Sequence, residues 1–152
     1  MAFQFSLQRV LNLREQETQE AELKIELTKK NIQELKNLII KERDLYFSER
    51  EELNEFVKKS QVYKISVYER SLSLRQAKLV EMLENLRAMQ SDLEVYQHAL
   101  IQARRKQKIL ENLKDIKETE YSKEMARKSQ LILDELGSQK YFRMQNQEKE
   151  EE

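Results

Sequence analysis

The stretch LNLREQETQEAELKIELTKKNIQELKNLIIKERDLYFSEREEL, residues 11–53, carries a mostly apolar row of residues at every seventh position. This row consists of Leu11, Thr18, Ile25, Ile32, Ile39, Tyr46 and Leu53. A heptad row sustained over such a length is the seam of a coiled coil. The 152-residue chain contains no proline and a single glycine, so little in it opposes helix formation. The sequence therefore predicts long helices that pair.

A second seam follows in a different helical frame, with apolar residues in alternating steps of three and four. Its members are Leu72, Leu79, Met82, Leu86, Met89, Leu93, Tyr96, Leu100 and Ala103. Between the two seams lies KKSQVYKISVYE, residues 58–69, where β-branched residues and serines accumulate and the heptads lose register. We place the reversal of the chain in this segment, near Ser60.

The expected architecture is all-α: two long helices that form an antiparallel coiled-coil hairpin in a single domain, residues 1–152. Helix 1 is predicted at about residues 3–58, the turn at about 59–66 and helix 2 at about 67–145, so the second helix overhangs the first. The acidic tail at 146–152 is expected to fray, because like charges crowd a helix C-terminus. Since each chain can pair with itself, we expect a monomeric hairpin.

The companion row of the first seam is only partly apolar. It contains Leu7, Arg14, Ala21, Thr28, Leu35, Glu42, Glu49 and Phe56. Leu38 and Leu45 lie beside the position where Glu42 interrupts this row. We therefore expect the seam to drift towards these two leucines.

The charge balance excludes several classes of partner. The 28 basic and 28 acidic residues cancel, so no global field attracts nucleic acid or an anionic membrane. No apolar run approaches the roughly 20 residues of a spanning helix, and the N-terminal residues do not resemble a signal peptide. Together with the lack of cysteine, these features predict a cytoplasmic protein that binds no nucleic acid and does not insert directly into the membrane.

The sequence offers little for catalysis or ligand chemistry. The single histidine, His98, lies in a helical run with no second histidine to share a metal ion, which favours an ordinary position on the helix surface over a metal-ligand role. The neighbours Asp134 and Glu135 are typical of a solvated helix face. Glycine-rich phosphate loops and zinc motifs are missing from the sequence. We expect no enzymatic activity, no cofactor and no metal site.

Three groups of residues are candidates for partner contact. Arg104, Arg105, Lys106 and Lys108 form the densest basic run, which is either solvated surface or a docking patch for an acidic protein surface. Ile40 and Phe47 fall one position after the seam residues Ile39 and Tyr46, so both are predicted to point outward along one line of the helix. Three tyrosines near the reversal either close the hairpin tip or bind a partner: Tyr46, Tyr63 and Tyr68.

Three segments of the chain resemble parts of one known family. The opening FQFSLQRVLNLREQETQEAEL, residues 3–23, has an aromatic residue, a leucine and a Val-Leu pair before Leu-Arg-Glu, and it looks like the start of the flagellar type III export FliJ family. The segment ARRKQKILENLK, residues 103–114, is similar to its basic stretch before a leucine pair. RKSQLILDELGSQKYFR, residues 127–143, resembles its closing segment. The resemblance covers the full length of the chain.

The resemblance implies a cytoplasmic stalk, peripherally associated with the inner-membrane export gate and similar to the central shaft of rotary ATPases. Such a stalk enters the hexameric export ATPase FliI, engages the export gate protein FlhA and binds export chaperones. By this analogy, the residues that face the ATPase ring are Arg9, Arg14, Arg104, Arg105, Lys106 and Lys108. Those that face the gate are Ile40, Phe47, Tyr63 and Leu72. Two alternatives stay open: the homologous stalk of a virulence type III secretion system, and a structural coiled-coil scaffold unrelated to export.

Overall fold

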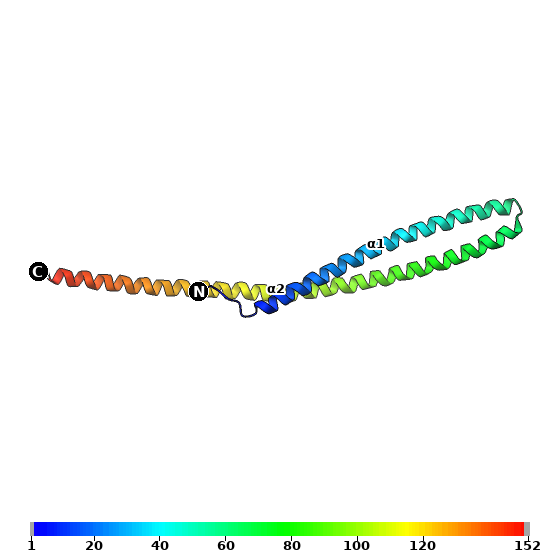
Figure 1. The fold of residues 1–152 in the computed structure, drawn as a ribbon. Coiled ribbons are helices and arrows are strands. Elements are labelled where there is room, and N and C mark those ends of the chain that lie inside the picture. The colour runs from blue at the N-terminus through cyan, green and yellow to red at the C-terminus, as the bar shows by residue number, and fades with distance from the viewer. Residues whose placement is uncertain (1, 151–152) are drawn as a thin grey trace. The chain divides into compact units, whose positions relative to one another are not determined.

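The computed structural model describes residues 2–150 and contains two helices, α1 (Gln8–Lys58) and α2 (Val62–Glu150), shown in Figure 1. No strand occurs among the described residues, which confirms the predicted all-α helical hairpin. The chain divides into two compact units. One unit comprises residues 16–104, and the other combines the N-terminal residues up to Glu15 with α2 from Arg105 onward. Each unit is described by itself below.

In the unit of residues 16–104, α1 and α2 run antiparallel, and their contacts mirror about Ser60. Four cross-helix contacts join residues that lie equally far before and after this serine: Lys24 with Tyr96, Glu42 with Lys78, Glu49 with Ser71, and Glu52 with Tyr68. Thr18, Ile25 and Ile32 of the first seam are buried, and the second-seam residues from Leu79 to Ala103 are all partly buried. Both heptad seams therefore face each other as the sequence predicts.

The turn is shorter than the predicted 59–66, because α1 ends in a motif that reverses the chain within residues 59–61. Ser60 adopts a left-handed conformation with φ of 58°. Its amide donates to the Val57 carbonyl at 3.2 Å, and the Gln61 amide donates to the Phe56 carbonyl at 3.2 Å. These are the two bonds of a Schellman motif, with serine at the position that glycine usually occupies. Helix α2 then begins at Val62, not at residue 67, because β-branching lowers helix propensity only slightly and packing outweighs it.

In the other unit, residues 2–7 lie outside α1, which begins at Gln8 and not at residue 3 as expected. The Phe3 ring packs on the Tyr121 ring, with centroids 5.6 Å apart, and the Gln8 amide donates to the Phe5 carbonyl at 3.1 Å. The extended segment thus reaches an aromatic contact on α2 that a continued helix would not provide. Leu11 is buried in this unit, at 3% exposure.

Beyond Tyr121, α2 continues as a helix whose residues 122–150 are all exposed. We call this part the exposed segment. Residues 146–150, predicted to fray, belong to the helix. Lys149 lies in the last turn, where a cation interacts favourably with the helix dipole, and this offsets the neighbouring glutamates. Residues 151 and 152 of the predicted tail lie outside the described residues. None of the described helical sequence is both long and apolar enough to cross a membrane.

Candidate partner-binding sites

The seam contains a buried carboxylate where drift was expected. Glu42 is only 7% exposed, whereas Leu38 and Leu45 are about half exposed. The prediction that the seam shifts towards these leucines is therefore wrong. The same face of α1 points to α2 on both sides of Glu42, because Arg75 and Lys78 of α2 form ion pairs with this carboxylate in the seam. No rotation of α1 is therefore needed to bring an apolar residue into the seam at this position.

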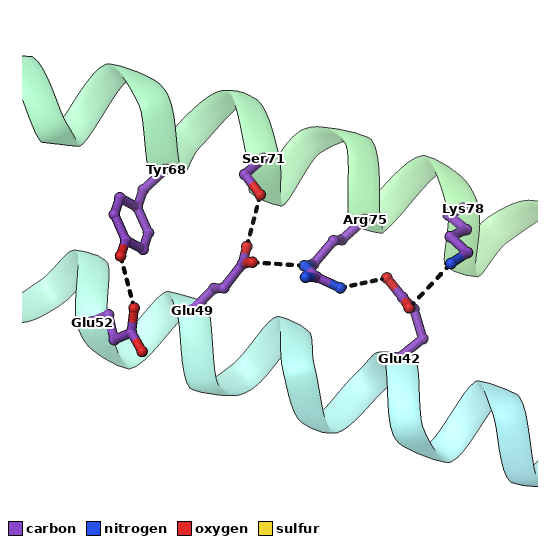
Figure 2. Close-up of polar contacts among 7 residues, drawn as sticks. All are labelled: Glu42, Glu49, Glu52, Tyr68, Ser71, Arg75 and Lys78. Carbon is purple, nitrogen blue, oxygen red and sulfur yellow. Dashed lines mark hydrogen bonds and ion pairs between the residues drawn. The ribbon is translucent and has the colours of Figure 1, made fainter.

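Four charged residues from the two helices form a connected group, shown in Figure 2, which we call the ion cluster. The Arg75 Nη1 lies 2.9 Å from Glu42 Oε1, and the Arg75 Nε lies 2.9 Å from Glu49 Oε1. The Lys78 Nζ contacts Glu42 Oε2 at 3.3 Å. Glu42 and Glu49 are one heptad apart on α1, so one guanidinium joins two successive layers of the seam.

Two further hydrogen bonds extend this polar zone towards the turn. The Ser71 hydroxyl donates to Glu49 Oε2 at 2.9 Å, and the Tyr68 hydroxyl donates to Glu52 Oε2 at 2.8 Å (Figure 2). The Tyr68 ring also packs on Phe56, with centroids 5.1 Å apart. Tyr68 thus contributes to closing the hairpin tip, one of the two roles considered for the tyrosines.

The hydrogen bonds across the helix pair shift the pKa values of three residues: Glu42, Tyr68 and Arg75. Desolvation by burial raises the pKa of Glu42, but the hydrogen bonds and charges of Arg75 and Lys78 outweigh it, so this pKa is lowered from its ordinary value. The hydrogen bonds to Glu49 and Glu42 raise the pKa of Arg75. Likewise, the hydrogen bond to Glu52 raises the pKa of Tyr68. The contacts between the two helices therefore favour the charged forms of Glu42 and Arg75.

Sequence reasoning missed Arg75, although its position gave a signal. Arg75 comes three residues after Leu72 and four before Leu79, in the frame of the second seam. An arginine in one seam and two glutamates in the facing seam form a complementary set once both rows are aligned about Ser60. The apolar pattern alone could not identify them, because that pattern treats every charged residue as solvent-facing.

The residues predicted to face the export gate divide between surface and core. Ile40 and Phe47 are 46% and 51% exposed, two turns apart along α1, as the heptad phase predicts. Tyr63, in the first turn of α2, is 72% exposed. Leu72 is only 9% exposed and packs in the interhelical seam. Because Leu72 belongs to the core of the hairpin, the exposed candidates are the other three residues, Ile40, Phe47 and Tyr63, which we call the gate candidates.

The basic residues predicted to face the ATPase are distributed over both units. Arg104, in the unit of residues 16–104, forms an ion pair with Glu22 at 2.9 Å. In the other unit, Arg105, Lys106 and Lys108 are exposed along α2. Arg9 of that unit is also exposed. It lines a groove of about 440 Å³ together with Phe3, Phe5 and Lys114, among other residues. Arg14 is partly exposed.

No arrangement suited to metal binding appears among residues 2–150: no group of three or more histidine, cysteine, aspartate or glutamate side chains converges on a point. His98 is exposed on α2, in agreement with the predicted surface position.

Comparisons with known proteins place the chain in a family. Searches of curated proteins and of solved structures gave no match. A family model described as "Flagellar FliJ protein" matches residues 3–146. This range includes both helical seams, the turn and most of the exposed segment. The match extends over nearly the whole chain, and the chain therefore belongs to the flagellar FliJ family.

Proposed function

We propose that this protein, whose family is associated with flagellar export, is the stalk that links the hexameric export ATPase FliI to the export gate protein FlhA. It works in the cytoplasm, beside the gate at the inner membrane, and assists export chaperones. The protein supplies no catalytic group of its own in this role. Its contribution is a stiff scaffold with a separate contact surface for each partner.

The exposed segment is the single observation that carries this proposal. Leu131, Ile132 and Leu133 are consecutive and each more than half exposed. With 3.6 residues per helical turn, three consecutive side chains point to three different sides of the helix. A helix that is apolar on several sides suits an environment that encloses it. The pore of a ring-shaped ATPase is such an environment, and exposed cations at Arg105, Lys106 and Lys108 suit acidic groups on the ring.

A charge-reversal experiment tests the ATPase contact. The variant R105E/K106E/K108E should lose stimulation of FliI hydrolysis and keep its helicity, because exposed charges contribute little to stability. Phosphate release by FliI and circular dichroism measure the two effects. The matched control K29E/K30E/K36E changes the same number of exposed cations on α1 and should stimulate normally. Equal stimulation by both variants would show that the basic run is only solvated surface.

The gate contact is assigned to the gate candidates Ile40, Phe47 and Tyr63. Replacing Ile40 and Phe47 by alanine should weaken binding to the FlhA cytoplasmic domain by about tenfold or more, since the loss of two interface anchors commonly exceeds about 1.4 kcal/mol. Titration calorimetry measures this affinity. L23A/L27A, which removes two other exposed leucines of α1, is the matched control and should bind normally. Unchanged affinity of I40A/F47A would move the search for the gate contact to Tyr63.

The scaffold alternative makes a different prediction about mass. A coiled coil that functions by oligomerising should associate at micromolar concentration, whereas a stalk whose helices pair with each other should have the mass of one chain. Light scattering separates the two.

The virulence alternative differs only in the partner system. Pull-down against flagellar and injectisome ATPases distinguishes it from the flagellar stalk.

A further inference from the structure

Each helix of this chain carries a seam that, by its apolar content alone, fits a second copy of the same helix. The row through Ile25, Ile32 and Ile39 on α1 would pack as well against an identical row in a parallel pair of chains. An apolar seam does not specify its partner. In coiled coils, buried polar residues and charges supply that choice, usually at a cost in stability.

The positions of the ion cluster distinguish between the two pairings. Glu42 and Glu49 occupy successive layers of the α1 seam, with side chains 9% and 22% exposed. In a parallel, in-register pair of α1 helices, each would face its own copy, so that two carboxylates would meet in each of two layers. Like charges forced together and away from water are strongly unfavourable.

Helix α2 supplies the opposite charges at the same layers. Arg75 reaches both carboxylates at 2.9 Å, and Lys78 reaches Glu42 at 3.3 Å. A pair of α2 helices would in turn place Arg75 against another Arg75. Each parallel, in-register homotypic pairing therefore brings like charges together in the seam, whereas the pairing of α1 with α2 neutralises them.

We propose that the ion cluster selects α2 as the partner of α1 and rejects a second copy of α1. The three-residue turn after Lys58 then makes the pairing intramolecular, because it holds the complementary helix of the same chain beside α1. The cluster is thus a recognition element within the seam, and this role is independent of the export function proposed above.

Pairing in trans tests this selection. The variants E42R/E49R and R75E/K78E each place like charges together within one chain, so each alone should melt at lower temperature than the wild type. In an equimolar mixture, the introduced charges complement each other between chains. The mixture should therefore regain helicity and show the mass of two chains. The combined variant E42R/E49R/R75E/K78E should return to the mass of one chain. A mixture that shows no more helicity or association than its separate components would overturn the proposal.

Removing the charges tests the rejection of a second copy. The variant E42L/E49L/R75L replaces three of the four cluster charges in the seam by leucine. It should self-associate at a concentration about tenfold or more below that of the wild type, as measured by analytical ultracentrifugation. The matched control E51L/E55L/R70L introduces three leucines with the same charge change at exposed positions. It should keep the mass of one chain under the same conditions. If the seam variant also keeps that mass, or if both variants associate equally, the ion cluster has no selective role.

Discussion

Two parts of helix α2 have similar residue types but opposite surroundings. Residues 72–103 bury apolar side chains against α1 at steps of three and four, whereas residues 122–150 are exposed throughout. The exposed segment is not poor in apolar residues, since it contains Leu131, Ile132, Leu133, Leu136 and Phe142. These side chains point in several directions, so one neighbouring helix could not cover them. Burial within this chain follows the spacing of apolar residues more than their number.

The largest effect on the free energy of unfolding is expected from truncating a side chain in the seam, compared with the same kind of truncation in the exposed segment. Ile32→Ala should lower the free energy of unfolding by about 2–5 kcal/mol, because Ile32 is buried in the seam. Leu133→Ala removes a side chain of similar size from the exposed segment and should change it by less than about 0.5 kcal/mol. Urea unfolding followed by circular dichroism measures both. Similar losses for the two variants would mean that the exposed segment packs against something in the free protein.

An effect of intermediate size on the melting temperature is expected when Glu42 is replaced and the pH is varied. The pKa of Glu42 is lowered in the folded chain, so its charge contributes stability above the ordinary value of 4.5, and this contribution is lost as the pH falls through the folded-state pKa. Glu42→Gln should therefore melt below the wild type at neutral pH, and the difference should shrink as both proteins are acidified below that range. Melting curves from about pH 7 to about pH 3 measure the difference.

The matched control for the acid experiment is Glu51→Gln, at an exposed position on α1. It should melt close to the wild type at neutral pH, because exposed charges contribute little to stability. A gap between the wild type and E42Q that stays constant from neutral to acidic pH would contradict the assigned electrostatic role of Glu42.

The smallest effect on the melting of the hairpin is expected at Gly137, the single glycine, within the exposed segment. A Cβ atom added there would meet nothing within 4 Å, so alanine fits without strain. Gly137→Ala should stabilise the local helix by roughly 0.5–1 kcal/mol and leave the melting midpoint of the hairpin unchanged. Hydrogen exchange of the amides around residue 137 detects the local gain. A shift of the main melting transition would instead indicate that the exposed segment and the hairpin unfold together.

The sequence predicted the helices, both seams and the reversal near Ser60, because the spacing of apolar residues determines which faces pair. It did not predict that Glu42 is buried, since the stabilising cations come from a distant part of the chain. The length of the turn was overestimated because local propensity does not reveal a serine in the left-handed conformation. Residues 2–7 escaped prediction for a related reason: the Phe3 contact with Tyr121 joins residues far apart in sequence.

The candidate sites were predictable only in part. Heptad phase placed Ile40 and Phe47 on the surface, because exposure follows directly from helix periodicity. The same phase places Leu72 in the second seam, and the family resemblance alone had suggested it as a contact residue. Which partner an exposed residue binds is a property of two molecules, so the sequence of one chain yields a surface and a charge but not its counterpart.

The tight turn at Ser60 also has a kinetic consequence. Cross-helix contacts span sequence separations that grow steadily from the turn: 16 residues for Tyr68 with Glu52, 33 for Arg75 with Glu42, and 82 for Arg104 with Glu22. The entropy lost on closing a loop rises with its length, so the contacts nearest Ser60 form at the lowest entropic cost. Once they exist, each following contact closes only a short additional loop. Folding of the hairpin should therefore begin at the tip and proceed along the helices like a zipper, with Glu22 and Arg104 among the last to meet.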